Sequence, residues 1–138
     1  MPQILKHCMH LSSINLLVPK YFLYKLSLKT GISIGLNVFG KGLYVPHHGC
    51  IVVNSNAKFG DKCVIQCGVN ISEGVIGGDH CYLGAGSKMM IGARIGNDVI
   101  VGANAVVTKV FLENNVVLAG VPAKIISNKG FNSSRSSI

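Results

Sequence analysis

The sequence predicts an all-β fold, a parallel β-helix of hexapeptide repeats, with a short helical segment before it. Two observations support this prediction. Apolar residues recur every six positions from residue 51 to residue 107, and a second series of small or apolar residues runs two positions ahead of the first. A helix repeats every 3.6 residues, and amphipathic strands joined by variable turns do not keep one period for ten repeats. Stacked hexapeptides do.

Both series are expected to face one interior, because residues two apart in an extended segment point to the same side. Glycine or asparagine often follows, and both tolerate the left-handed backbone of a tight corner. Three corners close a triangular coil of eighteen residues, and Gly77 would then lie beside Phe59, whose ring is expected to fill the space. The first series is Val53, Phe59, Ile65, Ile71, Gly77, Leu83, Met89, Ile95, Val101 and Val107, and the second is Ile51, Ala57, Cys63, Val69, Val75, Cys81, Ser87, Ala93, Val99 and Ala105.

Residues 1–30 are expected to form an N-terminal helical cap. Within them, Leu16–Lys29 has the pattern of a short helix after Pro19, with lysines at its other positions. We favour a helix that covers the open end of the β-helix over one that attaches to a membrane surface. Thr30 and Gly31 end it. Its apolar positions are Phe22, Leu23 and Leu26.

Residues 31–127 are expected to form the β-helix, whose first coil contains one enlarged corner. Eight residues separate Val45 from Val53 where the repeat has six, so two extra residues swell the segment Pro46–Cys50. Insertions in repeat proteins collect at exposed corners where binding happens. His47 and His48 lie in this corner and are the strongest local functional signal in the chain.

The chain after Val107 is expected to leave the regular period. We predict a turn over residues 111–115, a final strand and cap around Pro122 within residues 116–126, and a disordered tail over residues 128–138. The segment Glu73–Asp79 also departs from the corner pattern, so a looser corner is expected there, either near the functional pocket or as a harmless bulge.

The net charge of +8 is unevenly placed, since no Asp or Glu precedes Asp61. This balance suits an anionic partner. No nucleic-acid-binding signature accompanies the charge, so no nucleic-acid partner is expected. A phosphate-bearing cofactor or an anionic membrane surface fits at least as well.

The five cysteines do not form an obvious disulfide framework. Cys63 and Cys81 occupy inward positions and are expected to be reduced core residues. Neither a cleavable signal peptide nor a spanning helix is indicated in the opening residues, where Lys6, His7 and His10 interrupt the apolar pattern. We therefore expect a single-domain cytoplasmic protein.

One outer face of the predicted prism is apolar as well. The central residues of its strands are Val64, Tyr82 and Ile100, whereas each of the other two faces carries charged residues. Because a contiguous exposed apolar stripe usually marks a contact surface, we predict a homotrimer through this face.

Four stretches, GKGLYVPHHGCIVVN, LGAGSK, VGANAVVTK and AGVPAK, carry a family resemblance. They resemble the serine acetyltransferase-like branch of the left-handed β-helix (hexapeptide) acyltransferases over about residues 30–127. The resemblance implies that the β-helix is left-handed, that acetyl-CoA is the donor, and that the protein is a trimer with active sites between subunits. It also implies that His47 is the general base. His48, next to it, is a candidate for lining the acceptor pocket. His80 is expected to be solvated or structural.

The resemblance also implies a cofactor groove. Ala85, Ala103, Thr108, Lys109 and Lys124 match its CoA-binding positions. Small side chains permit close approach of the pantetheine arm, and ammonium groups suit phosphate. The alternative for both lysines is a solvated surface charge. No metal is expected, because His47 and His80 are widely separated and the spacing does not resemble the histidine set of the β-helical carbonic anhydrases.

Two departures from the serine acetyltransferase pattern bear on the acceptor. Pro46 stands where that family has an aspartate before the base, and the large N-terminal helical domain is missing. Both count against L-serine as acceptor. What remains of the pattern resembles the short acetyltransferases that decorate surface-polysaccharide sugars. His47 would then be oriented by a backbone carbonyl, by Ser33 or Asn37, or by a carboxylate from a neighbouring subunit.

Two function classes follow. The first is an O- or N-acetyltransferase in which His47 deprotonates an acceptor that attacks the thioester directly. The second is a non-catalytic β-helical scaffold or binding protein, for which the missing carboxylates are the best argument.

Overall fold

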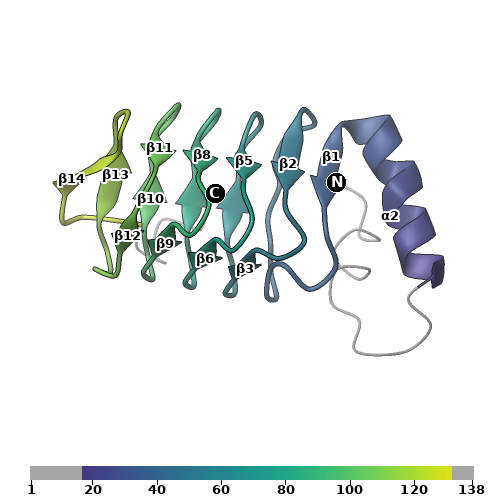
Figure 1. The fold of residues 1–138 in the computed structure, drawn as a ribbon, viewed down its shortest axis with the longest axis horizontal. Coiled ribbons are helices and arrows are strands. Elements are labelled where there is room, and N and C mark those ends of the chain that lie inside the picture. Colours follow the sequence, from purple (N-terminus) through teal and green to yellow (C-terminus); the bar gives the residue numbers. More distant parts are fainter. Residues whose placement is uncertain (1–16, 132–138) are drawn as a thin grey trace.

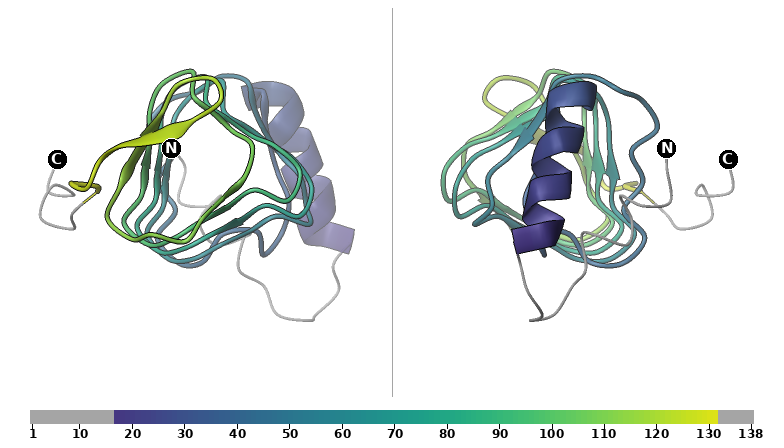
Figure 2. Two further views of the ribbon diagram at one scale, coloured as in Figure 1. Left: turned by 60° about the vertical axis from the view of Figure 1, so that its left-hand side comes forward. Right: turned by 90° about the vertical axis from the view of Figure 1, so that its right-hand side faces the viewer.

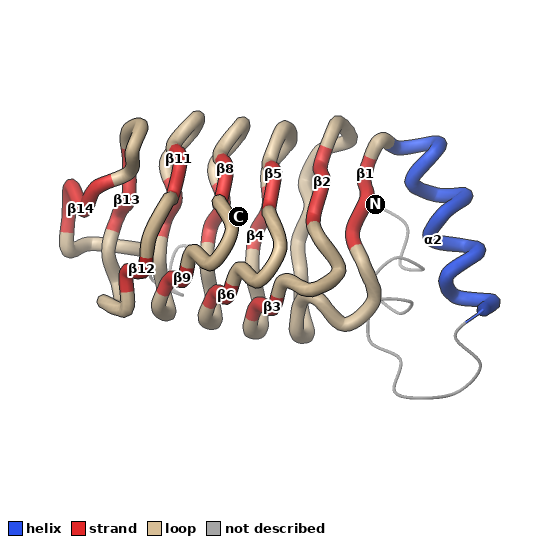
Figure 3. Tube along the Cα trace, in the orientation of Figure 1, coloured by secondary structure: helices blue, strands red, loops and turns tan. Residues whose placement is uncertain are grey.

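The computed structural model describes residues 17–131. They form one N-terminal helix, α2 (Leu17–Thr30), followed by a β-solenoid of short strands joined by tight corners (Figures 1 and 3). Within these residues, the predicted β-helix of hexapeptides with a helical segment before it is confirmed. The expectations for residues 1–16 and 132–138 lie outside the described residues.

The strands form three sheets that are the sides of a triangular prism (Figure 2). Sheet A contains β1 (Ile32–Ile34), β2 (Ile51–Val53), β5 (Asn70–Ile71), β8 (Lys88–Met89) and β11 (Val106–Val107). Sheet B contains β3 (Lys58–Phe59), β6 (Ile76–Gly77), β9 (Arg94–Ile95) and β12 (Val110–Phe111). Sheet C contains β4 (Val64–Ile65), β7 (Tyr82–Leu83), β10 (Ile100–Val101), β13 (Val117–Ala119) and β14 (Lys124–Ser127).

The observed register confirms the predicted stacking. Val53 pairs with Ile71, Ile71 with Met89, and Met89 with Val107, all in parallel and one coil apart. Both apolar series are buried along their whole length. The central strand residues fall on the three outer faces as predicted, so Val64, Tyr82 and Ile100 lie in one row of sheet C.

Gly77 is the one glycine among the inward strand positions, and a large neighbour accounts for it. A Cβ at Gly77 would collide with Cδ1 and Cε1 of Phe59, so the ring occupies the space as predicted. The ring of Phe59 also stacks on that of Phe39, with centroids 4.8 Å apart.

Replacing Gly77 with alanine should therefore overpack the core. We expect the free energy of unfolding to fall by about 1–3 kcal/mol, measured by urea denaturation. Adding Phe59→Leu should recover part of this loss, because the smaller side chain makes room for the methyl group. A Gly77→Ala protein as stable as the wild type would contradict this packing.

Ser87 is the polar exception within the buried series. Its side chain is fully buried, and its hydroxyl is the buried side-chain oxygen without a hydrogen-bond partner in the described chain. An unpaired buried hydroxyl is unfavourable, and alanine is nearly isosteric. We expect Ser87→Ala to raise the free energy of unfolding by about 1 kcal/mol, which thermal denaturation would detect. A clear loss of stability would instead show that the hydroxyl is paired.

The first coil confirms the enlarged corner. Tyr44 pairs with Val64, and Ile51 lies opposite Val69 in the next coil. The corner from Val45 to Ile51 is therefore two residues longer than the corresponding corner from Ile65 to Val69. The corner between β1 and Phe39 is one residue shorter than the corresponding corner of the next coil, between β2 and β3. Ile34 pairs with Val53 and Phe39 pairs with Phe59, so five positions in the first coil match six in the second.

The last coil differs from the prediction. The expected turn begins within a strand, β12, which pairs with β9 and buries Phe111. The corner before β12 is two residues shorter than the one before β9, so the period of six hides this strand. The expected single final strand is the antiparallel pair β13 and β14.

The chain stays packed beyond the expected end of the β-helix. The amide of Gly130 donates to the carbonyl of Asn115, at 2.9 Å, and the amide of Phe131 donates to that of Asp98, at 2.8 Å. Residues 128–131 therefore lie against the last coils. The predicted loose corner at Glu73–Asp79 is wrong, because β6 keeps the regular register with β3 and β9.

Helix α2 lies across the open end of the prism beside β1 (Figure 1). Leu26 is half-buried against the core, as predicted for a cap, and Leu23 is half-buried too. Phe22, which was expected to share this face, is 59% exposed. It lies about 100° around the helix from Leu23 and so points away from the coil. Among the described residues, no helix is long and apolar enough to cross a membrane.

Candidate functional site

The enlarged corner presents both histidines to solvent. His47 and His48 are exposed on the loop between Tyr44 and β2. Gly49 follows with φ at 143°, a backbone conformation that favours glycine. The corner leads back against the end of α2, since the amide of Ile51 donates to the carbonyl of Gly31 at 3.0 Å. Backbone contacts thus fix both ends of the loop, while the two imidazoles remain accessible.

The histidine corner is the first in a row of corners along one edge of the prism. The amide of Gly68 donates to the carbonyl of Cys50, that of Gly86 to Cys67, and that of Asn104 to Ala85, at 2.7–2.9 Å. We call this row, formed by residues 46–50, 66–68, 84–86 and 102–104, the histidine edge. Ala85 and Ala103 lie on it and are exposed, so the structure places them on the same edge as His47.

The other predicted cofactor residues lie in two places. Lys124 belongs to β14, opposite Ala119, and the next amide back along the chain, that of Ala123, donates to the carbonyl of Val106 at 2.8 Å. Lys124 is therefore near the last coil's end of the histidine edge. Thr108 and Lys109 follow β11 and are exposed at the corner that leads into sheet B. The width of sheet A separates them from Ala103.

The imidazole of His47 has no intramolecular partner in the described chain. Among residues 17–131, no hydrogen bond or ion pair reaches His47 or His48. Ser33, one expected orienting residue, projects from the outer face of sheet A beside Val52. Asn37 lies at the edge between sheets A and B, where its carbonyl accepts a hydrogen bond from Lys58 Nζ. Asn37 therefore lies one side of the triangle away from the histidine corner, and Ser33 makes no hydrogen bond to His47 within residues 17–131.

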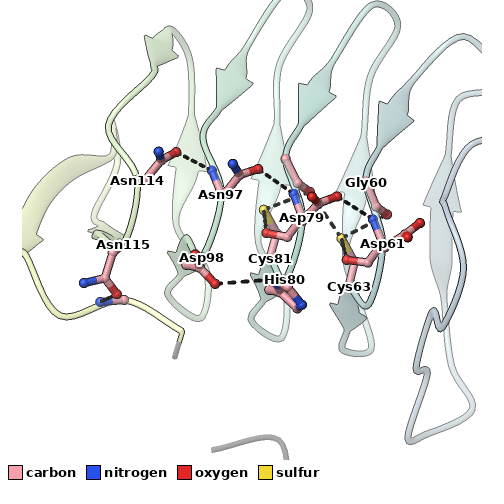
Figure 4. A network of polar contacts seen from close by, with 12 residues as sticks. Gly60, Asp61, Cys63, Asp79, His80, Cys81, Asn97, Asp98, Asn114 and Asn115 are labelled. Carbon is pink, nitrogen blue, oxygen red and sulfur yellow. Dashed lines mark hydrogen bonds and ion pairs between the residues drawn. The ribbon is translucent and has the colours of Figure 1, made fainter. Parts of the chain in front are cut away.

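A second edge, between sheets B and C, holds a polar ladder that the sequence reasoning missed (Figure 4). The ladder is formed by four Asp or Asn side chains, and the Oδ1 atom of each accepts a hydrogen bond from a backbone N–H of the preceding coil, at 2.7–2.8 Å. His80 Nδ1 lies 3.6 Å from Asp98 Oδ1 on the same edge, which favours the structural one of the two roles expected for it. The spacing of Asp61, Asp79 and Asn97 by eighteen residues is the signal that could have found it. The ladder residues are Asp61, Asp79, Asn97 and Asn114.

The cysteines divide by environment. Cys63 and Cys81 are buried next to the ladder, and Cys50 and Cys67 are exposed on the histidine edge; all four are free thiols. A hydrogen bond with Cys63, and then burial, raises the pKa of the Cys81 thiol. In the described part of the chain, no group of three or more His, Cys, Asp or Glu side chains could hold a metal ion.

Alkylation should distinguish the two pairs. Treating the native protein with iodoacetamide is expected to modify Cys50 and Cys67 and to spare Cys63 and Cys81, because the reagent must reach the sulfur and the second pair is fully buried. Peptide mass spectrometry before and after denaturation would measure this. Equal labelling of Cys81 in the native protein would contradict the buried arrangement.

The apolar face of sheet C is partly covered by the chain itself. Val64, Tyr82 and Ile100 are half-buried. The ring of Phe131 packs on that of Tyr82, with centroids 5.6 Å apart. The predicted contact face is thus continuous with the packed end of the chain.

Comparison with known proteins relates the chain to hexapeptide-repeat proteins and to serine acetyltransferases. A family model described as the hexapeptide repeat of succinyl-transferase matches residues 74–109. The chain is 34% identical to the serine acetyltransferase of Mycobacterium tuberculosis over 106 residues, which cover 70% of this chain and 46% of that protein. The chain thus spans about half the length of the serine acetyltransferases that it matches.

Two further similarities are to a protein named for O-acetyl transfer and to a structure solved with CoA. A stretch of 55 residues, 40% of this chain and 28% of the relative, is 49% identical to the putative lipopolysaccharide biosynthesis O-acetyl transferase WbbJ of Escherichia coli K12. A solved serine acetyltransferase in complex with CoA superimposes with a TM-score of 0.63 at 25% identity, covering 80% of this chain and 48% of that one.

Proposed function

We propose that this hexapeptide-repeat protein, which is related to the serine acetyltransferases, is an acetyl-CoA-dependent acetyltransferase. It moves an acetyl group to a hydroxyl or amine of a small acceptor, a sugar or a serine-like molecule. The observation that carries the proposal is the position of His47 on one exposed edge of the prism together with Ala85 and Ala103.

His47 acts as the general base. An imidazole can both accept and release a proton near neutral pH, as a general base for this reaction must. It accepts the proton of the acceptor hydroxyl as the oxygen attacks the thioester carbonyl, and the carbon–sulfur bond then breaks. The same proton passes from the imidazolium to the departing CoA sulfur. This step needs an accessible imidazole, and the enlarged corner provides one.

The donor fits the histidine edge. Ala85 and Ala103 are small and exposed, so a pantetheine arm can approach the backbone closely. Lys124 near the last coil supplies an ammonium group for a phosphate. Thr108 and Lys109, at the corner between sheets A and B, do not line this edge. The CoA complex of the related serine acetyltransferase supports acetyl-CoA as the donor.

The acceptor is a carbohydrate hydroxyl in our preferred form of the proposal. The similarity to a protein named for lipopolysaccharide O-acetylation supports this class. His48, exposed beside His47, lines the acceptor side. Serine-like acceptors are the second class, because several curated relatives are serine acetyltransferases.

The active form is a homotrimer through Val64, Tyr82 and Ile100, with sites between subunits. His47 has no orienting partner within residues 17–131. A second copy of the chain could supply that partner, because a catalytic histidine normally has its ring held by a hydrogen bond.

The alternative is a non-catalytic scaffold. The lack of a carboxylate on His47 within the described chain favours it, since such a group usually orients a catalytic imidazole.

Acetyl-CoA turnover separates the two. The full chain should release free CoA thiol when acetyl-CoA is supplied with sugars, nucleotide sugars or serine, and mass spectrometry should show one acetyl group added to the acceptor. A protein that binds CoA but acetylates none of these would exclude sugars, nucleotide sugars and serine as acceptors. A protein that does not bind CoA at all would favour the scaffold.

A further inference from the structure

Helix α2 carries two stripes of residues at helical spacing, and the solenoid uses one of them. Residues 19, 23, 26, 27 and 30 are half-buried and face the first coil. Leu17, Tyr21, Tyr24 and Leu28, spaced by four, three and four residues, are exposed by 77%, 59%, 61% and 66%. At 100° per residue these four side chains lie on one line along the outer side of the helix. We call them the outer stripe.

Lysines flank the outer stripe on both sides. The helix has no acidic residue, and helical geometry places Lys20 on one side of the stripe and Lys25 and Lys29 on the other. The Nζ of Lys25 lies 5.7 Å from the ring centroid of Tyr21, above the ring. Residues 1–60 together contain six lysines and no Asp or Glu, so six of the eight net positive charges precede Asp61.

We propose that the outer stripe of α2 docks on an anionic lipid bilayer. Apolar side chains flanked by lysines allow a helix to lie in the plane of the membrane interface. Tyrosine suits that position because its ring is apolar and its hydroxyl is polar. Helix α2 has fourteen residues, so it lies on the surface and does not cross it.

Pairing with the same helix of a second copy is the main competing arrangement. Two such helices would bring lysines together with no acidic residue on either helix to balance them, and like charges brought close together repel each other. Charge complementarity therefore favours phosphate headgroups over another α2.

The position of α2 gives the docking a consequence for the rest of the molecule. The helix runs across the open end of the prism (Figure 2, right), so a docked helix places the first coil next to the membrane. Gly31, which follows α2, accepts the hydrogen bond from Ile51 that closes the histidine corner. His47 and His48 thus lie in the coil nearest the lipid. The docking itself does not depend on the acetyl transfer proposed above.

Co-sedimentation with vesicles tests the proposal on the full chain. We expect binding to vesicles of equal parts phosphatidylglycerol and phosphatidylcholine, little binding to phosphatidylcholine alone, and weaker binding at high salt. The double variant Lys25→Glu, Lys29→Glu should lower the partition coefficient at least tenfold, because each lysine contributes about a fivefold factor. Tyr24→Ser with Leu28→Ser should lower it similarly.

Two matched controls keep the same changes away from α2. Lys62→Glu with Lys129→Glu changes the net charge equally, and Ile91→Ser with Leu112→Ser removes side chains that are 75% and 70% exposed. Both should retain binding within about twofold, a change below the contribution of one lysine. Circular dichroism would confirm that each variant is folded.

Three results would overturn the proposal. The wild type could fail to bind the anionic vesicles, the α2 variants could bind as well as the wild type, or the controls could lose binding equally. If the wild type does not bind vesicles, and the Tyr24→Ser, Leu28→Ser variant forms a smaller assembly in solution than the wild type does, the outer stripe would be assigned to a second copy of the chain.

Discussion

Replacing His47 with alanine should abolish acetyl transfer while leaving the protein folded. A general base contributes typically 10²–10⁴-fold to the rate, so kcat should fall by about that factor. The side chain is exposed and has no partner within residues 17–131, so its removal should not change stability. Thiol release from acetyl-CoA measures the first effect and thermal denaturation the second.

His80 provides a matched control for this variant. It lies on the ladder edge, away from the histidine corner, and its φ of 52° is tolerated by asparagine. His80→Asn should keep near wild-type turnover. Activity that survives His47→Ala, or that is lost equally in His80→Asn, would remove His47 from the mechanism.

Placing a charge on the apolar face of sheet C should separate the proposed trimer into single chains. Ile100 lies between Tyr82 and Val117 in that sheet, and Ile100→Lys would bury an unpaired ammonium group in the contact. Analytical ultracentrifugation should then report one chain of 14.6 kDa instead of three. Turnover should fall with the mass, because the proposed sites lie between subunits.

The control for this variant lies on another face. Ile76 occupies the equivalent strand position in sheet B and is 42% exposed. Ile76→Lys should leave the proposed trimer and its activity unchanged. An intact Ile100→Lys trimer would remove this face from the interface.

The regular coils could be predicted because their corners have equal lengths. Where every corner has the same number of residues, a period of six fixes both the buried positions and the register, including the contact between Gly77 and Phe59. The period could not predict β12, since the corner before it is two residues shorter. Strand pairing selected that register because it buries Phe111.

The candidate site was predicted in part for the same reason. The two extra residues around His47 are visible in the sequence, but the edge on which a corner falls follows from the coil geometry. Ala85 and Ala103 share an edge with His47, whereas Lys109 lies one side of the triangle further along. What orients His47 could not be predicted, since no hydrogen bond within residues 17–131 reaches it.

Helix α2 shows a different limit of sequence reasoning. Capping the prism and docking on a membrane were alternatives in the sequence, because both use apolar residues among lysines. The structure makes them compatible, since Leu26 packs on the core while Leu28 remains 66% exposed.

Calorimetric titration of the full chain with CoA tests the central claim, that the histidine edge is the binding surface for the acyl donor. We expect saturable binding by the wild type and its loss in Ala103→Trp, because a large side chain at this exposed corner blocks the approach of the pantetheine arm. Lys41→Trp, at an exposed corner of the ladder edge, should bind as the wild type does. Undetectable binding by the wild type, or equal binding by Ala103→Trp, would contradict the account.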